Sequence, residues 1–308
     1  MRIGIHVGVS GRSGNAIDEL IDEARQAQAA GLDFWMPQMS DVDALSALAV
    51  VGREVQGLQV GTAVVPTYPR HPMVMAMQAL TIQAATGGRL TLGIGLSHQV
   101  VIEGAYGLSY DKPVRHMREY LNILMPLLHE GRADVTGEEL SAHTFSPMKP
   151  AGSTPPSVIV AALGSQMLNL AGSLADGTAL WMVGPRTIET HIVPKITAAA
   201  QRSGRPAPQV VVGLPVSVTA DPDAARARAA EIFGFYNNLP SYRAMLDIEG
   251  AEGPADVAIV GDEATVRSAL LRLGEIGATA LSLPVFGTTD ERKATMNLLA
   301  EMAGTVGA

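Results

Sequence analysis

The sequence predicts an α/β protein folded as a closed (β/α)8 TIM barrel with insertions. Strand-like and helix-like segments alternate along the 308-residue chain, and they amount to eight strands with a helix after each. Eight such units in a chain of this length are typical of a closed barrel, whereas an open doubly wound sheet, the alternative, normally has fewer. Hydrophobic residues make up 47% of the chain and charged residues 17%, which is ample material for a core.

The expected strands are short runs of β-branched and other apolar residues, because such side chains suit a buried pleated surface. In chain order they cover residues 3–9, 32–36, 58–65, 89–94, 157–161, 178–182, 210–218 and 280–285.

The expected helices lie between these strands, where apolar residues recur every three or four positions. Asn15, Ser165, Asp221 and Asp262 stand at helix starts, where a side-chain oxygen can accept a free backbone N–H, and Gly31 ends the first helix. In chain order the helices cover residues 15–31, 42–55, 72–85, 113–129, 165–174, 187–201, 223–236, 262–273 and a last segment to about 302.

The alternation breaks twice. Residues 131–156 suggest a small hairpin followed by four prolines, and residues 237–260 have no regular pattern and suggest a lid or a second insertion. We expect both to be insertions on one domain that covers residues 1–308.

Composition excludes several classes of protein. The net charge is −8 with a pI of about 5.4, and no Lys/Arg cluster is present, so nucleic acid and anionic membranes are not expected partners. The chain has no cysteine, which excludes disulfides and zinc-thiolate sites, and its histidines lack metal-ligand spacing. No uninterrupted apolar stretch is long enough to span a membrane, and no signal peptide precedes the first strand. We therefore expect a cytoplasmic enzyme with a small-molecule substrate.

In a barrel the active site lies at the carboxyl ends of the strands. The corresponding loops are residues 8–12, 37–40, 65–71, 95–100, 161–166, 182–185, 219 and 284–287.

Three of these loops carry features that suggest a ligand. Gly164 and Ser165 begin a helix whose free N–H groups suit an anion, although an ordinary helix cap is the alternative. Gly93 and Gly95 permit close approach to a flat ligand or simply let the chain leave a barrel strand. His98 can act as a general acid or lie on the surface, Trp181 can line the pocket, and Trp35 suits the core better.

No nucleophile elbow, zinc-protease motif, phosphate-binding loop or paired carboxylates occur, which argues against a hydrolase. Arg70, His71 and Arg186 could meet an anion. A rim so poor in acids and bases suits a bound cofactor that carries the chemistry itself.

Five segments resemble the bacterial luciferase-like superfamily of flavin- and deazaflavin-dependent oxidoreductases, and most closely its actinobacterial branch that uses coenzyme F420. They are GTAVVPTYPRHP (61–72), GGRLTLGIGLSH (87–98), PVRHMREYL (113–121), AALGSQMLNLAG (161–172) and ADGTALWMVGP (175–185).

The resemblance implies a luciferase-like TIM barrel, commonly a homodimer, with a non-prolyl cis peptide near Ala63 and Val64 that supports the middle ring of the cofactor. It also implies that the loop after the fourth strand lines the ring, that the turn opening residues 161–172 holds the phosphate, and that the end of the sixth strand borders the cofactor. The implied cofactor-binding residues are Ala63, Val64, Gly95, Leu96, Ser97, Ala162, Leu163, Gly164, Ser165, Gln166, Trp181, Met182 and Gly184.

The chain departs from the sugar-phosphate dehydrogenases of this superfamily at two positions. Those enzymes have a glutamate where this chain has Leu96, and an acid or histidine after the second strand, where it has Pro37-Gln38-Met39. Glucose-6-phosphate dehydrogenase activity is therefore not expected. We take His98 as the candidate proton donor and Gln38 as a candidate polar contact.

Three functions follow from the resemblance. The first is an F420-dependent oxidoreductase that transfers a hydride between the deazaflavin and a C=C, C=N or alcohol/carbonyl group. The second is an FMN-dependent monooxygenase, and oxygen consumption separates the two because deazaflavin reacts poorly with oxygen. The third is a non-catalytic flavin-binding barrel, which would bind cofactor tightly without turnover.

Overall fold

The computed structural model describes residues 1–8, 14–38 and 41–306. Parts of two rim loops, residues 9–12 and 39–40, and the end of the first expected strand lie outside the described residues. Within the described part, no helix is both long and apolar enough to cross a membrane.

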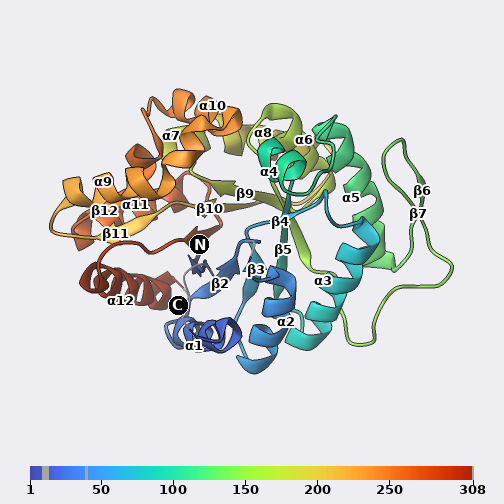
Figure 1. Cartoon of the computed structure of the whole chain (residues 1–308), viewed down its shortest axis with the longest axis horizontal. Helices are drawn as coiled ribbons and strands as arrows, with labels where there is room; N and C mark the ends of the chain where they lie inside the picture. Colours follow the sequence, from blue (N-terminus) through green and yellow to red (C-terminus); the bar gives the residue numbers. More distant parts are fainter. Residues whose placement is uncertain (9–13, 39–40, 307–308) are drawn as a thin grey trace.

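Eight parallel strands close into a barrel, which confirms the expected fold class (Figure 1). Each strand pairs with the next in chain order, and the last pairs with the first, so the sheet has no open edge. The barrel strands are β1 (Arg2–His6), β2 (Asp33–Met36), β3 (Val60–Thr62), β5 (Leu90–Gly95), β8 (Ser157–Ala161), β9 (Gly177–Trp181), β10 (Gln209–Gly213) and β13 (Ala280–Leu283).

The helices form an outer ring around the strands (Figure 1). They are α1 (Ala16–Ala29), α2 (Ala44–Glu54), α3 (Pro72–Thr86), α4 (Gln99–Gly104), α5 (Pro113–Glu130), α6 (Ser165–Leu174), α7 (Pro185–Thr187), α8 (Val193–Arg202), α9 (Pro222–Phe233), α10 (Pro240–Glu249), α11 (Glu263–Glu275) and α12 (Thr289–Val306). The side chains of Asn15, Asp221 and Asp262 cap α1, α9 and α11 as expected.

Two expected strands are interrupted. Residues 58–65 divide into β3 and β4 (Val65–Pro66), with a cis peptide bond between Ala63 and Val64, where the resemblance placed it. The single strand expected at 210–218 is wrong: β10 ends at Gly213, and β11 (Val216–Val218) leaves the barrel to pair with β12 (Ile259–Gly261). Pro215 stands at the break and has no N–H to donate to a ladder.

The segment 237–260 is not irregular, as the sequence suggested. It contains a 3₁₀ turn at Gly234–Asn238, then α10, then a second 3₁₀ turn at Pro254–Val257, before β12 begins. The helix expected at 187–201 is also modified, because its first part is a π-helical turn at Ile188–Ile192. The helix α4 was not expected at all.

The first insertion contains the expected hairpin. Strand β6 (Asp134–Thr136) runs antiparallel to β7 (Ser141–His143), and both lie outside the barrel beside α5 (Figure 1). The Glu119 carboxylate on α5 accepts N–H groups from Glu138, Glu139 and Leu140 at the hairpin turn, which fixes the hairpin to the barrel.

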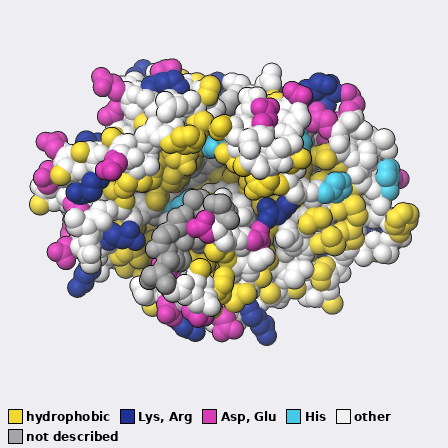
Figure 2. All heavy atoms as spheres, viewed as in Figure 1, with side chains coloured by type: hydrophobic (Ala, Val, Ile, Leu, Met, Phe, Trp, Pro, Cys, Tyr) yellow, Lys and Arg dark blue, Asp and Glu magenta, His cyan; other side chains and the backbone are white. Residues whose placement is uncertain are grey.

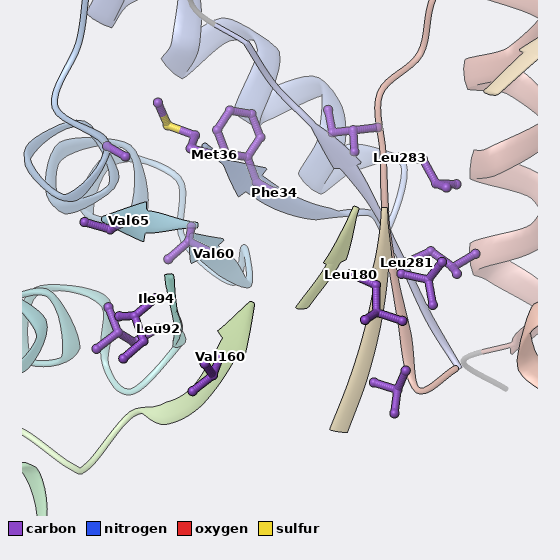
Figure 3. Close-up of a cluster of buried hydrophobic side chains, with 14 of the residues drawn as sticks. Phe34, Met36, Val60, Val65, Leu92, Ile94, Val160, Leu180, Leu281 and Leu283 are labelled. Atoms are coloured by element: carbon purple, nitrogen blue, oxygen red, sulfur yellow. The ribbon is translucent and has the colours of Figure 1, made fainter. Parts of the chain in front are cut away.

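Hydrophobic side chains fill two layers, because alternate residues of each strand point to opposite sides. The outer layer lies between strands and helices, and Figure 3 shows part of it, contributed by residues such as Phe34, Leu92 and Leu281. The inner layer fills the barrel and consists of Trp35, Ile159, Ala179, Val211 and Ala280.

Trp35 occupies the barrel interior, as the sequence favoured, and is 1% exposed. Its indole fits because two neighbouring strands lack a side chain beside it. A Cβ at Gly61 would lie 2.4 Å from Trp35 Cε3, and a Cβ at Gly4 would lie 2.7 Å from Trp35 Nε1. Both distances are shorter than any van der Waals contact, so these two glycines are required for the indole to fill the barrel.

Candidate active site

Five rings contact one another in series near the carboxyl ends of the barrel strands. We call them the aromatic array: His6, His98, Trp181, Tyr236 and Tyr242. His6 stacks on Trp181 with ring centroids 5.0 Å apart and an interplanar angle of 27°. Trp181 meets Tyr236 edge to face at 5.8 Å, and Tyr236 lies 5.0 Å from Tyr242. Tyr242 meets the edge of His98 at 5.8 Å.

The array joins segments that are distant in the sequence. It connects β1, β9, the 3₁₀ turn at Gly234–Asn238, α10 and the loop after β5. In Figure 2 hydrophobic side chains gather near the centre of the same face, below α10 in the view. Ligands of a barrel bind at the carboxyl ends of its strands, so this is where the candidate site lies.

His6 was not singled out in the sequence, although it is the last residue of β1. Its Nδ1 and the Ser282 Oγ on β13 share a hydrogen bond of 3.1 Å. Burial lowers the pKa of His6 to about 4, so its imidazole is neutral near pH 7. The sequence could have indicated His6. It follows Gly4 by two positions, and because side chains alternate along a strand, both residues face the barrel interior.

Trp181 is partly exposed at the end of β9. A Cβ at Gly213 on the adjacent β10 would lie 2.9 Å from Trp181 Cε3, so the indole occupies the space that a side chain there would fill. The next residue, Met182, has a φ of 54°, which non-glycine residues seldom adopt.

His98 precedes α4, and its ring makes no capping hydrogen bond to that helix. The ring lies against Tyr236 and Tyr242. Burial lowers the pKa of His98 below its ordinary value, so the neutral form is favoured at pH 7. Neutral imidazole is a hydrogen-bonding partner or a base rather than a ready proton donor. The role of His98 as proton donor stays a prediction.

The Gln38 amide takes part in the local structure at the start of α2. Its oxygen accepts the Ala44 N–H at 3.1 Å, and its nitrogen donates to the Val42 carbonyl at 3.3 Å. Arg70 also donates to this oxygen, at 3.5 Å, and forms an ion pair with Asp43. Contact between Gln38 and a substrate stays a prediction.

The glycines of β5 are needed for packing against β3 and the cis peptide. A Cβ at Gly93 would lie 2.0 Å from the Thr62 carbonyl oxygen, and a Cβ at Gly95 would lie 2.7 Å from Val64 Cγ2 and 3.0 Å from Ala161 Cβ. The requirement for glycine therefore comes from packing between the strands, which is neither of the two explanations that the sequence suggested. Beyond them, Ser97 has a φ of 60°.

The turn before α6 is open. Gly164, not Ser165, is the N-cap residue, and no side chain caps this helix. A Cβ at Gly164 would meet nothing within 4 Å, and Ser165 and Gln166 are exposed. Behind the turn, the His191 Nε2 donates to the Leu163 carbonyl at 2.9 Å, and Lys195 Nζ donates to His191 Nδ1 at 2.8 Å.

Two other candidates, Gly184 and His71, are occupied by internal contacts. A Cβ at Gly184 would lie 2.2 Å from the Glu249 carboxyl carbon, and the Glu249 carboxylate accepts the Thr187 N–H at 2.7 Å. His71 accepts the N–H of Met73 at the start of α3, as the sequence allowed.

A second aromatic cluster borders the loop after β5. Tyr68 stacks on His116 with centroids 3.9 Å apart, and Tyr110 lies 5.2 Å from Tyr68 and donates to the Ser97 carbonyl at 3.4 Å. The Tyr68 hydroxyl is buried and has no hydrogen-bond partner among the described residues. Burial lowers the pKa of His116 to about 4, so this cluster is also neutral.

A groove on the described surface lies elsewhere. It has a volume of about 640 Å³ and is lined by residues of α11 and of β12, such as Ile259, Thr265 and Ala269. None of the candidate site residues lines it. The described residues also contain no group of three or more His, Asp or Glu side chains suited to a metal ion.

Comparisons with known proteins agree with this architecture. A family model described as luciferase-like monooxygenase matches residues 1–280. A 5,10-methylenetetrahydromethanopterin reductase from Methanolobus tindarius is 27% identical over 286 residues, covering 92% of this chain and 86% of that protein. A putative coenzyme F420-dependent oxidoreductase from Mycobacterium tuberculosis is 38% identical over 99 residues, covering 32% of this chain and 28% of that one.

A coenzyme F420-dependent tetrahydromethanopterin reductase from Methanopyrus kandleri superposes with a TM-score of 0.79 at 19% identity, covering 97% of each chain, which is a likeness of fold. The family match spans the first seven barrel strands and ends at the first residue of the eighth, β13. The chain belongs to the luciferase-like monooxygenase family.

Proposed function

We propose that this protein is a coenzyme F420-dependent oxidoreductase that acts on a neutral organic molecule. The observation that carries the proposal is the aromatic array, which forms an apolar wall at the strand ends and holds two neutral histidines but no acid. Such a wall can position a flat cofactor and a substrate and exclude water, while the cofactor supplies the chemistry.

The residues present fit a tricyclic cofactor with a phosphate. Ala63, Gly95 and Ala161 offer small side chains at the ends of β3, β5 and β8, so a flat ring could lie against this side of the mouth. The uncapped first turn of α6, beside the open space at Gly164, offers free N–H groups for the phosphate. A bound deazaflavin would supply a carbon centre that gives or accepts a hydride.

The other cofactor-binding residues keep the roles that the family implies. Leu96 and Ser97 would line the ring, Ala162, Leu163, Ser165 and Gln166 would surround the phosphate, and Trp181, Met182 and Gly184 would border the cofactor. The His191–Lys195 pair supports the phosphate assignment, because it holds the Leu163 carbonyl and thereby the direction of the turn.

The substrate would be uncharged where it meets the array. Tyr236, Tyr242 and Trp181 offer apolar faces, His6 and His98 are neutral, and Arg70 of the loop before α3 is paired with Asp43. Among the described residues of the array, a charged substrate group would find no charged partner to offset its desolvation, which is costly.

An FMN-dependent monooxygenase is the second candidate, favoured by the description of the matching family. The test is a parallel assay of one protein preparation. Under anaerobic conditions, neutral ketones, enones and imines are supplied in turn with reduced F420 and neutral alcohols with oxidised F420, and deazaflavin absorbance is followed. With reduced FMN, oxygen uptake is measured. Deazaflavin turnover without oxygen uptake supports the proposal, and substrate-stimulated oxygen uptake contradicts it. Tight binding of either cofactor with no turnover in either arm would indicate a non-catalytic flavin-binding barrel.

A substitution at the α6 turn tests the phosphate assignment. Gly164→Asp places a carboxylate at the helix N-terminus, in open space, where it would repel and displace a phosphate. It should weaken FMN binding at least about tenfold, a factor equal to roughly 1.4 kcal/mol, and leave riboflavin binding unchanged. Gly253→Asp is the matched control, because Gly253 is also an N-cap residue with open space around it. Equal effects on FMN and riboflavin would reject the assignment.

We further propose that the protein is a homodimer, as the family resemblance implies. Val50 of α2 and Val74 and Met77 of α3 are large hydrophobic residues with 40 to 48% of their surface exposed. Figure 2 shows hydrophobic side chains gathered on the flank that carries α3. Light scattering at micromolar concentration should give twice the chain mass of 32.2 kDa, and a monomer would contradict the proposal.

A further inference from the structure

We infer that His6 is a catalytic residue of this site, and that its Nε2 hydrogen-bonds the oxygen of a neutral hydroxyl or carbonyl substrate. The inference rests on the proposed function for its setting, and it narrows the substrate class from any hydride acceptor or donor to one with oxygen on the reacting carbon.

The position of His6 is fixed by three strands. It ends β1, its Nδ1 bonds to Ser282 on β13, and its ring face lies on Trp181 of β9. Gly213 on β10 leaves room for the Trp181 ring in this stack, because a Cβ there would lie 2.9 Å from Trp181 Cε3. The imidazole is therefore held in one plane with one nitrogen already engaged, which is how a catalytic histidine is normally oriented.

The second nitrogen, Nε2, has no hydrogen-bond partner among the residues that the structure describes. Within the described part of the chain, the only hydrogen bond of the His6 side chain is the one from Nδ1 to Ser282, and the residue remains partly exposed at the mouth of the barrel. The ring stacks on the uncharged Trp181, and its polar partner is the Ser282 hydroxyl. Nothing in these contacts occupies Nε2.

The neutral state suits an oxygen ligand. Because burial lowers the pKa of His6 to about 4, the ring carries no charge at pH 7 and each nitrogen is either a donor or an acceptor. When Nδ1–H donates to Ser282, Nε2 accepts a substrate hydroxyl. When the Ser282 hydroxyl donates to Nδ1, Nε2–H donates to a carbonyl. The same residue thus matches either partner of an alcohol and ketone pair.

If His6 had only a structural role, it would need its aromatic ring and its Nδ1 but not its Nε2. Space filling and stacking on Trp181 need only an aromatic ring, and the bond to Ser282 needs only the Nδ1 position. These three functions of the side chain can be separated by substitution. Phe keeps the ring without nitrogens, Asn places a polar atom near Nδ1, and Gln places one near Nε2.

The test compares His6→Phe, His6→Asn and His6→Gln in the full-length protein loaded with its cofactor. We expect Phe and Asn to lower kcat/KM for an alcohol or ketone at least about 100-fold, the usual scale of acid–base and hydrogen-bonding catalysis. Gln should recover at least about tenfold of that loss. In all three variants the affinity for the cofactor should change by a smaller factor than kcat/KM. Turnover by Phe close to that of the original protein, or equal recovery by Asn and Gln, would overturn the inference.

A second measurement needs no cofactor and so stays informative if the proposed function is wrong. The protein is labelled with ¹⁵N-histidine, and the His6 resonances are assigned by their loss in His6→Gln. Addition of cyclohexanol, a neutral apolar alcohol, should shift the His6 Nε2 resonance and leave exposed His143 unchanged. His143→Ala serves as the control variant for folding. No shift of His6 up to the solubility limit of cyclohexanol would overturn the inference, even if F420 binds as proposed.

Discussion

The indole of Trp181 stacks on the imidazole of His6 although their strands, β9 and β1, are separated in the barrel by β10 and β13. Gly213 allows the contact, because a Cβ there would lie 2.9 Å from Trp181 Cε3. Because Gly213 on β10 has no side chain, Trp181 of β9 can stack on His6 of β1, and the two rings form one wall of the candidate site.

Gly213→Ala should disturb this wall. The added methyl group would press on the Trp181 ring and, at the same distance, on the Leu180 carbonyl oxygen. We expect a loss of about 1–3 kcal/mol of stability, the usual cost of overpacking, and a changed tryptophan emission. Urea denaturation followed by fluorescence measures both. Gly304→Ala, in α12 with open space around it, is the control and should be neutral or slightly stabilising. Unchanged stability and emission in Gly213→Ala would contradict the packing described.

Single and double substitutions at Gly61 and Trp35 test the packing of the barrel interior. Gly61→Ala should cost about 1–3 kcal/mol because its methyl group would overlap the Trp35 indole. Trp35→Phe removes the overlapping atoms at the cost of a cavity. The double variant should therefore be more stable than the sum of the single effects predicts, with a coupling of at least about 0.5 kcal/mol. Additive effects in urea denaturation would mean that the two residues do not touch as described.

Glu291 should make stability depend on acid pH. Hydrogen bonds from the Thr219 hydroxyl and the Thr288 N–H lower the pKa of Glu291 to about 2, against an ordinary value of 4.5. A carboxyl whose pKa is depressed by folding stabilises the folded state above its unfolded pKa and loses this effect as pH falls toward its folded pKa. Glu291→Gln should therefore be less stable than the original protein at pH 7, by about 1–3 kcal/mol, and the difference should shrink between pH 4.5 and 2.

The control for this experiment is Asp290→Asn, the neighbouring carboxylate on the same turn of α12. It lacks the bonds to Thr219 and Arg228 that Glu291 makes. A pH-independent difference for Glu291→Gln, or the same pH dependence for Asp290→Asn, would show that these bonds are not responsible.

His191→Leu should affect the cofactor phosphate through the α6 turn. The substitution removes the bond to the Leu163 carbonyl and frees that turn to rotate. We expect FMN to bind about tenfold more weakly, equal to one charge-assisted hydrogen bond or roughly 1.4 kcal/mol, with riboflavin unaffected. Fluorescence titration measures both ligands, and His143→Ala is the surface-histidine control. If riboflavin binding weakened by the same factor as FMN binding, the substitution would have disturbed the whole site at the carboxyl ends of the strands and not the phosphate position alone.

The barrel itself could be predicted from the sequence, because strand and helix periodicity act locally. Asn15, Asp221 and Asp262 cap the helices they were expected to cap, and eight strand segments close in chain order. Pro215 explains the one strand that was wrongly extended, since its missing N–H ends the ladder at β10. The cis peptide at Ala63–Val64 came from family resemblance and not from any local pattern.

The composition of the site could be predicted only in part, because it depends on which distant segments meet. Trp181 and His98 were found from their places after strands. Tyr236 ends an expected helix and Tyr242 lies in a segment without clear periodicity, and only the fold brings them between those two rings. Contact of His6 with Trp181 depends on an absent side chain at Gly213, which no pattern within one strand reveals.

The most direct test of the central claim is a binding titration of the purified protein with oxidised coenzyme F420 and with FMN, side by side. The account predicts that F420 binds at least about tenfold more tightly than FMN, a difference of roughly 1.4 kcal/mol. Tighter binding of FMN would contradict it and would make the flavin-dependent monooxygenase the better description of this protein.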